Sequence, residues 1–375
     1  MIRILHVIDS LDLGGGQTAL LNFARFADRS QFHLEVATMH RRGVFWEPFE
    51  QLSIPVYSLS PHRWLPLYIP RLIHLLRHGH FHIVHCHLNA ANWIAKPIAA
   101  ACGVPIRIAH DQCNDKFRSN HPALVLLDAL TNRLSSTVLA VSTSTRDFLL
   151  SREDLDPSQV LLFPNAVDTK HFHPVSTAAR AEAKQQLGFE ADCFLVAGAG
   201  RLVPQKDFST FLSAFSLFSQ QRPNSRFAIA GTGPEEVPLR HRAAELGVAN
   251  LGCFLGFLAD PRLLYQACDV FLLPSLYEGL PLTALEAMSS GIPVVASAVD
   301  GLREVIRSGE NGLLASAKQP TEFAAFLLRL HDSPAERSRI ADAARTHIQA
   351  HYDARTLVQQ LERLYLKTLL PTRAL

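Results

Sequence analysis

The sequence is poor in cysteine, and none of its cysteines forms a C-x-x-C pair. Widely spaced cysteines of this kind are typical of a reducing compartment. We therefore interpret them as reduced, buried thiols of a cytoplasmic protein. The six are Cys86, Cys102, Cys113, Cys193, Cys253 and Cys268.

Long apolar runs and an excess of one charge are also lacking. No apolar run approaches the roughly eighteen residues that a membrane span needs, and the first ten residues, "MIRILHVIDS", lack the parts of a signal peptide. The net charge is only +2, with lysine and arginine scattered. This argues against a nucleic-acid partner, whose phosphates attract clustered cations. Because 48% of the residues are hydrophobic, the chain can bury sizeable cores.

Short β-rich runs alternate with helical stretches along the chain, which is typical of parallel sheets with crossover helices. The turn-rich segment "FPNAVDTKHFHPVSTAAR" separates two such series and is interpreted as a linker. The sequence thus predicts an α/β protein of two doubly wound domains, residues 1–172 and 173–353, facing a central cleft. A helix is expected from about Asp353. Strands are expected at "RILHVID", "LEVATM", "IPVYSL", "HIVHCH", "IRIAHD", "TVLAVS", "FLVAGAG", "RFAIAGTG", "DVFLLPS" and "IPVVAS".

A glycine-rich loop follows the first expected strand, in "DSLDLGGGQT", and a helix is expected to begin near Gln17. Glycines let a backbone approach a ligand closely, and a helix N-terminus favours an anion. A dinucleotide site is unlikely chemistry for this loop, because the spacing is not G-x-G-x-x-G and Glu35 falls within a strand. A plain tight turn remains an alternative.

Histidines are concentrated in the first half of the chain, above all in "HGHFHIVHCH". His85 and His87 alternate along one expected strand, but no further metal ligand is visible nearby, so we predict no metal site. His87 is expected near the cleft. His110 ends a strand and should point at the cleft; a structural histidine is its alternative interpretation.

Two cations, Arg201 and Lys206, follow the first strand of the second series, in "GAGRLVPQKD". On a loop at a strand end they are able to clamp a diphosphate, arginine through its planar fork and lysine as a point charge. Solvated surface charges are the alternative.

The segment "YEGLPLTALEA" places Glu278 in a turn and Glu286 in the helix that follows. Thr283 and Glu286 match the capping-box pattern, so Glu286 has a purely structural alternative. Glu278 precedes the helix, where no cap is needed. The turn presents amides at a positive helix end, and a carboxylate on each side suits a ligand with hydroxyls next to a phosphate, such as a nucleotide sugar.

These segments resemble the retaining, family-4 type glycosyltransferases of the GT-B fold. "EGLPLTALE" resembles the E-x7-E motif of that family, and the block from Asp269 to Ser297 is highly specific. The resemblance covers most of the chain in order. It includes "GGGQ", "IVHCH", "IAHD", "AVSTSTRDFL", "PNAVD", "GRLVPQKD", "AGTGP", "LGFL" and "NGLL".

The resemblance implies roles for particular residues. Arg201 and Lys206 would bind the donor diphosphate and stabilise the leaving group. Glu278 would hydrogen-bond the donor sugar, and Glu286 the ribose. The remaining donor contacts would come from the backbone of Gly279, Leu280, Pro281 and Leu282, from Phe257 beside the base, and from Gly15 and Gly16 of the other domain; His110 would face the transferred sugar.

The implied activity is transfer of a hexosyl-type sugar from a UDP- or GDP-sugar to a polysaccharide, glycolipid or lipid-linked acceptor, with retention and without a metal or other cofactor. No D-x-D stands at a strand end, so the two cations would replace Mg²⁺. A sugar-nucleotide epimerase and an inert nucleotide-sugar-binding protein are the alternatives. Intact Arg201, Lys206, Glu278 and Glu286 argue against the inert protein.

The family also implies that the last helix, 354–375, crosses back to the first domain. It further implies a cytoplasmic protein at the inner membrane face, where the segment Trp64 to Arg77 would make peripheral contact; a helix packed on its own sheet is the alternative for that segment. The sequence departs from the family at His82, at Asp207 and at the Asp300-Gly301 pair. These departures leave acceptor preference and loop shape open.

Overall fold

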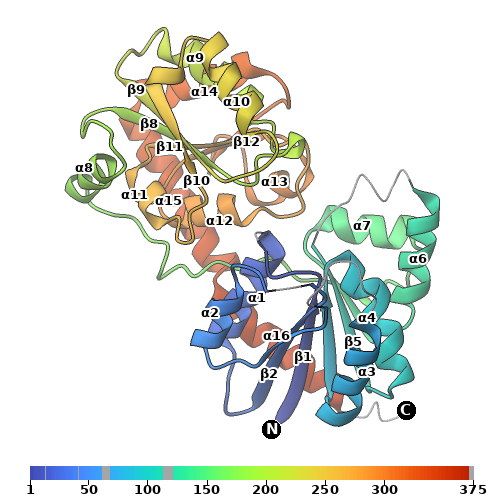
Figure 1. Cartoon of the computed structure of the whole chain (residues 1–375). Helices are drawn as coiled ribbons and strands as arrows, with labels where there is room; N and C mark the ends of the chain where they lie inside the picture. The colour runs from blue at the N-terminus through green and yellow to red at the C-terminus, as the bar shows by residue number, and fades with distance from the viewer. Residues whose placement is uncertain (13, 41, 61–67, 113–120, 371–375) are drawn as a thin grey trace. The chain divides into compact units, whose positions relative to one another are not determined.

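The computed structural model of the chain describes all residues except 13, 41, 61–67, 113–120 and 371–375. Its contacts divide the chain into two compact units (Figure 1). The N-terminal unit combines Met1–Ala166 with the segment from Ala354 onward, and the C-terminal unit is Val167–Asp353. The first division therefore falls a few residues before the boundary expected at 172.

The N-terminal unit is built on a parallel sheet. Its described strands number seven, in the order β3-β2-β1-β4-β5-β6-β7, and every neighbouring pair is parallel. The order steps outward from β1 in both directions, which defines a doubly wound sheet. The strands are β1 (Ile2–Ile8), β2 (Phe32–Thr38), β3 (Val56–Ser58), β4 (Ile83–His87), β5 (Ile106–Asp111), β6 (Thr137–Ala140) and β7 (Val160–Leu162).

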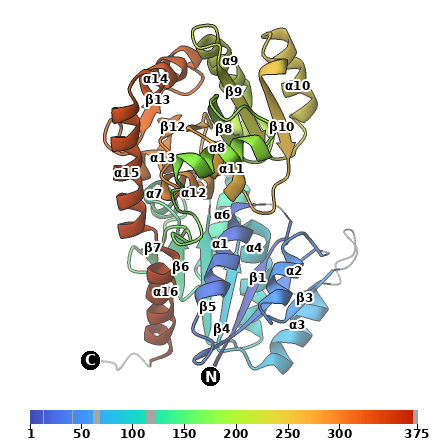
Figure 2. The same cartoon turned by 90° about the vertical axis from the view of Figure 1, so that its left-hand side faces the viewer.

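Helices cover both faces of this sheet (Figures 1 and 2). Alternate strand residues point to opposite faces, so Ile4 and Ile8 pack in one core with side chains of α1 and α16. Leu5 and Val7 pack in the other core with α3 and α4. The described helices of the unit are α1 (Gly15–Phe26), α2 (Trp46–Gln51), α3 (Tyr68–Gly79), α4 (Asn89–Ala101), α6 (Pro122–Asn132), α7 (Thr143–Arg152) and α16 (Ala354–Leu369).

The segment Trp64 to Arg77, expected to touch a membrane, is only partly described. Residues 64–67 lie outside the described residues, and the rest belongs to α3. Leu72 and Leu76 of α3 are buried in the core beneath their own sheet. The apolar residues of α3 therefore serve packing, which supports the alternative interpretation of this helix.

The C-terminal unit is built on a second parallel sheet. Its six described strands run in the order β10-β9-β8-β11-β12-β13, all pairs parallel. The prediction of two Rossmann-like sheets is therefore confirmed. The strands are β8 (Phe194–Ala199), β9 (Ser225–Ala230), β10 (Gly252–Gly256), β11 (Val270–Leu273), β12 (Val294–Ser297) and β13 (Leu313–Ala315).

A phenylalanine-rich helix anchors the core of the C-terminal unit. Phe211, Phe215 and Phe218 of α9 are fully buried against the sheet and α14. The helices of the unit are α8 (Thr177–Gln186), η1 (Pro204–Lys206), α9 (Phe208–Ser219), α10 (Glu236–Glu245), η2 (Ala249–Leu251), α11 (Arg262–Ala267), α12 (Leu282–Ser289), α13 (Asp300–Val305), α14 (Pro320–Asp332) and α15 (Pro334–His351).

The last helix, α16, belongs to the N-terminal unit although α15 belongs to the C-terminal unit. It packs beside α1, where Tyr365 is fully buried. The amide of Asp28 donates to Glu362 Oε1 at 2.6 Å. This helix is thus part of the core of a unit whose other elements all come from the first half of the chain.

None of the helices in the described part of the chain is long and apolar enough to cross a membrane. The described cysteines are all free thiols; Cys86, Cys193 and Cys268 are buried, whereas Cys102 and Cys253 are half-buried. Cys113 lies outside the described residues. The expectation of buried thiols is therefore correct for three of the five described cysteines.

Candidate active site

The turn between β11 and α12 carries Glu278. The strand ends at Leu273 and the helix begins at Leu282, so the turn lies at the carboxyl edge of the sheet, where ligands of doubly wound sheets bind. The side chain of Glu278 is only 7% exposed. Gly279, Leu280, Pro281 and Leu282 are buried as well. The first amides of α12 have no carbonyl of their own helix to bind, which leaves a positive helix end.

A second turn, after β8, lies directly beside this one. The carbonyl of Gln205 accepts from the Leu276 amide at 2.8 Å, and Gln205 Nε2 donates to the Tyr277 carbonyl at 2.9 Å. These bonds fix the short helix η1 against the β11–α12 turn. Lys206, the last residue of η1, is thereby held next to Glu278.

Lys206 and Glu278 form an ion pair. The distance from Lys206 Nζ to Glu278 Oε1 is 2.5 Å, and their side chains are 13% and 7% exposed. Each charge lies largely out of water and is neutralised by the other. Arg201 follows the same strand but is exposed, so the structure joins Lys206, and not Arg201, to the glutamate.

Asp207 replaces the residue that is commonly glycine or asparagine at this position in the family. Its backbone is left-handed, with φ +46°, a conformation that aspartate and asparagine tolerate better than other side chains. Its carboxylate also caps α9, accepting from the Thr210 amide at 3.3 Å and the Thr210 hydroxyl at 2.7 Å. Asp207 therefore satisfies the backbone requirement of this turn and adds a helix cap.

Glu286 does not take part in a capping box. The N-cap of α12 is Pro281, without a side-chain cap, and Thr283 lies inside the helix. The predicted capping alternative is therefore wrong for this structure. Instead Glu286 Oε2 accepts from the Tyr265 hydroxyl at 2.8 Å. Burial raises the pKa of Glu286 to about 7, although the Tyr265 bond opposes this shift.

Gly301 explains the Asp300-Gly301 pair. A Cβ on Gly301 would lie 1.5 Å from the Gly279 carbonyl oxygen, so only glycine permits α13 to touch the turn after Glu278. Asp300 is the first residue of α13, where a negative charge is favourable. The second position of the pair is thus constrained by the site, and the first is not.

Three buried hydroxyls near the site were not identified from the sequence. The side-chain oxygens of Ser275, Thr283 and Ser297 are buried without a hydrogen-bond partner among the described residues. They follow β11, lie in α12 and end β12. Buried polar groups normally have a partner, so an unsatisfied hydroxyl at a strand end marks a place for a ligand or water. A polar residue ending an apolar strand is the signal that would have found them.

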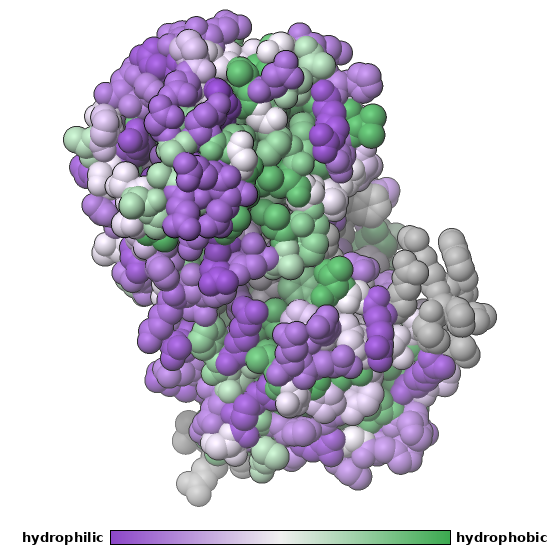
Figure 3. All heavy atoms as spheres, turned by 60° about the vertical axis from the view of Figure 1, so that its left-hand side comes forward, coloured by the Kyte–Doolittle hydropathy of each residue, from purple (hydrophilic) through white to green (hydrophobic). Residues whose placement is uncertain are grey.

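The loop expected beside the base is formed by the ends of β9 and β10. The Gly231 amide donates to the Gly256 carbonyl at 2.7 Å. A Cβ on Gly231 would lie 1.8 Å from the Gly200 carbonyl oxygen. Phe257 follows this contact and is 42% exposed, and Figure 3 shows hydrophobic residues gathered on part of the C-terminal unit in that view. An exposed aromatic ring at a sheet edge is available for stacking.

The glycine loop of the N-terminal unit leads into α1, which begins at Gly15. The helix thus starts two residues before the predicted Gln17. Gly15 is exposed and Gly16 is buried. Both belong to the N-terminal unit, as does His110, whereas the other predicted site residues belong to the C-terminal unit.

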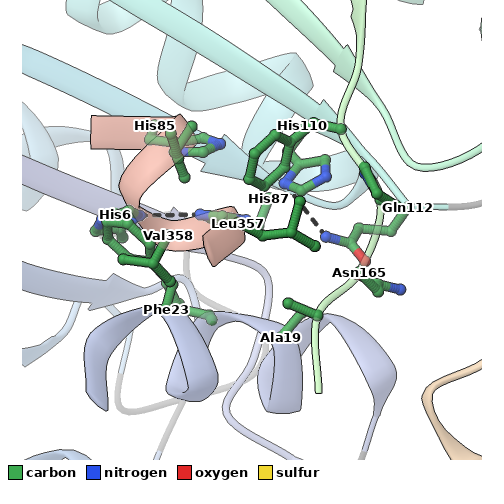
Figure 4. Close-up of a pocket in the computed structure, with 15 residues that line it drawn as sticks. His6, Ala19, Phe23, His85, His87, His110, Gln112, Asn165, Leu357 and Val358 are labelled. Atoms are coloured by element: carbon green, nitrogen blue, oxygen red, sulfur yellow. Dashed lines mark hydrogen bonds between the residues drawn. The ribbon is translucent and has the colours of Figure 1, made fainter. Parts of the chain in front are cut away.

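His110, near the end of β5, lies in a cluster of histidines (Figure 4). It lines a small cavity of about 30 Å³ together with His6, His85, His87 and Gln112. Burial lowers the pKa of His110 to about 4, so its imidazole is neutral. Gln112 Nε2 lies 3.4 Å from His110 Nδ1. His87, expected near the cleft, is buried in the same cluster.

Solved structures define the class of fold. Anabaena HepE in complex with UDP and glucose superimposes with a TM-score of 0.88 over 98% of this chain and 100% of that one, at 23% identity. TarM in complex with UDP gives a TM-score of 0.78 over 97% of this chain and 100% of that one, at 12% identity. The chain therefore has the GT-B fold of glycosyltransferases.

Sequence comparison defines the family. Residues 13–171 match Glycosyltransferase Family 4, and residues 179–347 match Glycosyl transferases group 1. The D-inositol 3-phosphate glycosyltransferase of Thermomonospora curvata is 32% identical over 72% of this chain and 68% of its own length. A galactosyltransferase of Escherichia coli, named for UDP-Gal and GlcNAc-diphosphoundecaprenol, is 26% identical over 70% and 69%. The chain belongs to this family and is a glycosyltransferase.

Proposed function

We propose that this glycosyltransferase transfers a hexosyl group from a UDP- or GDP-sugar to a glycan or lipid-linked acceptor, with retention of the anomeric configuration. The observation that carries the proposal is the buried Lys206–Glu278 pair, held beside the N-terminus of α12 at the carboxyl edge of the sheet. The pair places a cation and a hydrogen-bond acceptor next to a positive helix end, which suits a sugar attached to a diphosphate.

The pair exchanges its internal contact for contacts with the donor. When the donor enters, a diphosphate oxygen takes the place of Glu278 at Lys206, and a sugar hydroxyl donates to Glu278. Negative charge grows on the leaving diphosphate during transfer, so Lys206, Arg201 and the first amides of α12 stabilise the transition state more than the ground state. Glu278 positions the sugar and is not a nucleophile. These groups supply the stabilisation, so the transfer requires no metal.

The remaining residues recognise other parts of the donor. Glu286, beside Tyr265, accepts from the ribose hydroxyls, and Phe257 borders the base. Gly15 and Gly16 approach the diphosphate, and His110 faces the transferred sugar. A UDP-sugar is supported by the HepE complex with UDP-glucose and by the name of the E. coli relative. That relative also supports a lipid-linked acceptor, and with it action at the inner, cytoplasmic face of a membrane.

Replacing Lys206 by alanine tests the proposal. We expect Lys206→Ala to lower kcat by about 10²–10³-fold, as loss of one preorganised donor group commonly does. Lys170→Ala, an exposed lysine of the same unit, is the matched control and should keep full activity. Transfer is measured with a panel of UDP- and GDP-sugars chosen by thermal shift, since a bound donor raises stability. Unchanged transfer by Lys206→Ala would refute the site.

The epimerase alternative predicts a different product. Incubation of the protein with its nucleotide sugar and no acceptor yields the epimer of the sugar if that alternative holds. Under the proposal the nucleotide sugar is unchanged or slowly hydrolysed. Product configuration, measured by NMR, distinguishes retention from inversion in the complete reaction.

A further inference from the structure

Three histidines meet inside the N-terminal unit although they stand on two strands. His6 lies on β1, and His85 and His87 lie two apart on β4. The parallel register of β1 and β4 pairs His6 with His85, so all three side chains emerge on the same face of the sheet. All three are buried. Figure 4 shows them together with residues of α1 and α16.

Their ring nitrogens are close enough to share one ion. One nitrogen from each histidine lies within 4.8 Å of the other two. His6 Nδ1 and His87 Nε2 are 3.0 Å apart. Two nitrogens bound tetrahedrally to one zinc at 2.0–2.1 Å are about 3.3 Å apart, so small side-chain rotations would suffice.

The surroundings prepare the third histidine for the same task. His85 Nδ1 lies 2.6 Å from the Tyr365 hydroxyl of α16, which leaves Nε2 as its other nitrogen. That Nε2 is buried without a hydrogen-bond partner among the described residues. A partner on the outer nitrogen is the usual way in which a metal-binding imidazole is oriented.

Space and charge also fit an ion. The histidines line a cavity of about 30 Å³, which has room for a metal-bound water as a fourth ligand. Burial lowers the pKa of His6 to about 3 and the pKa of His85 and of His87 well below the usual value. All three imidazoles are therefore neutral near pH 7, as metal ligands must be.

We propose that His6, His85 and His87 form a binding site for a divalent transition metal of the zinc type, with Tyr365 orienting His85. The ion links β1 to β4 and, through Tyr365, to α16. Neutral imidazole suits Zn²⁺ and its neighbours rather than Mg²⁺ or Ca²⁺, which prefer oxygen ligands. The site stabilises the N-terminal unit and is separate from the sugar-transfer step, for which we propose no metal.

Metal binding by the full chain tests this site directly. The purified protein is stripped with a chelator, given zinc or cobalt ions at equimolar concentration, passed through gel filtration and analysed by elemental mass spectrometry. We expect one-to-one retention, a tetrahedral cobalt absorption spectrum with nitrogen ligands, and a higher thermal unfolding midpoint. A wild-type chain that retains no metal would overturn the proposal, whatever its variants do.

Two variants separate the site from surface binding. His74 and His78, with ring centroids 4.2 Å apart on the exposed side of α3, form the natural place for adventitious metal. The double variant His74→Gln, His78→Gln should keep the bound ion, and His6→Gln should bind it at least about tenfold more weakly. The reverse pattern would overturn the proposal. Should His6→Gln fail to fold, the wild-type cobalt spectrum decides: an octahedral spectrum with oxygen ligands refutes the histidine site.

Sugar transfer by the stripped protein keeps the two proposals distinguishable. Transfer that persists in chelator, together with one-to-one metal binding, supports both. Loss of activity on chelation that zinc restores would contradict the metal-independent mechanism while leaving the histidine site intact. Absence of metal binding with normal transfer would contradict the histidine site alone.

Discussion

Replacing Glu286 by glutamine should stabilise the donor-free protein at alkaline pH while weakening its grip on the donor. Glu286 is buried within the C-terminal unit, and its pKa is raised from 4.5 to about 7, chiefly by burial. Glutamine has nearly the same shape and retains an oxygen that accepts from Tyr265. The variant therefore removes the charge and keeps the packing.

The sign and size of the effect follow from this shift. A carboxyl with a raised folded-state pKa binds more protons folded than unfolded, so its stabilising contribution is complete below pH 4.5 and is lost as the pH rises through about 7. A shift of two to three units corresponds to about 3 kcal/mol. At pH 8 we therefore expect the variant to be more stable than the wild type by up to about 3 kcal/mol, and at pH 5 by less than about 1 kcal/mol.

The assay compares urea unfolding of wild type and Glu286→Gln between pH 5 and 8, with donor titration by calorimetry under the same conditions. Because an ionised Glu286 is the better acceptor for ribose hydroxyls, wild-type affinity for the nucleotide should rise as the pH rises through about 7. The variant should bind more weakly at pH 8 and lose this pH dependence. Glu310→Gln, a carboxylate 71% exposed in the same unit, is the control and should follow the wild type.

Parallel stability curves for wild type and Glu286→Gln from pH 5 to 8 would refute the reasoning about burial. Stability curves that diverge as expected, with nucleotide affinity unaffected, would instead remove Glu286 from the donor site. The two readouts thus test the structural and the functional statement separately.

Three further substitutions test individual features. Gly301→Ala should lower transfer at least about tenfold, because its Cβ would displace the Gly279 carbonyl; activity equal to wild type would show that α13 does not constrain the turn. Asp207→Ala should lower the urea midpoint by about 1–2 kcal/mol through loss of the Thr210 cap, whereas Asp207→Asn should change it by less than half as much; equal losses would exclude capping. Phe218→Ala should destabilise the C-terminal unit by about 3–5 kcal/mol, since the ring is fully buried; a loss under about 1 kcal/mol in urea unfolding would contradict the packing.

The strands that sequence analysis missed are β7, β10 and β13. Each lies at the edge of its sheet. A central strand of a parallel sheet is buried on both faces and reads as a continuous apolar run. An edge strand has one neighbour and is less covered: Leu161 and Leu162 of β7 are exposed, and β10 is half-buried throughout. The pattern that identified the central strands is therefore weak at the edges.

The two glutamates show how far a local motif reaches. The position of Glu278 in a turn before a helix followed from glycine, proline and the helical periodicity around it. Its pairing with Lys206, seventy-two residues away in the sequence, depends on β8 and β11 being neighbours. The local pattern also matched a capping box for Glu286, but Tyr265 of α11 provides its partner.

The histidines were judged on one strand alone. His85 and His87 were recognised as neighbours because residues two apart share a face. His6, eighty-one residues before His87, carries no local sign of proximity to them. The doubly wound order places β1 beside β4, so the predicted topology contained this neighbour, but the register that brings His6 opposite His85 is set by packing.

The sequence by itself determined the alternation of strands and helices, the two sheets, and the strand-end positions of Arg201, Lys206 and Glu278, because these depend on periodicity and turn-forming residues within short segments. Tertiary structure alone decided which of these residues touch. It paired Lys206 with Glu278, gave Glu286 a tyrosine partner, and gathered the histidines. Such contacts depend on strand order and register, which are properties of the packed chain as a whole and leave no mark in any one segment.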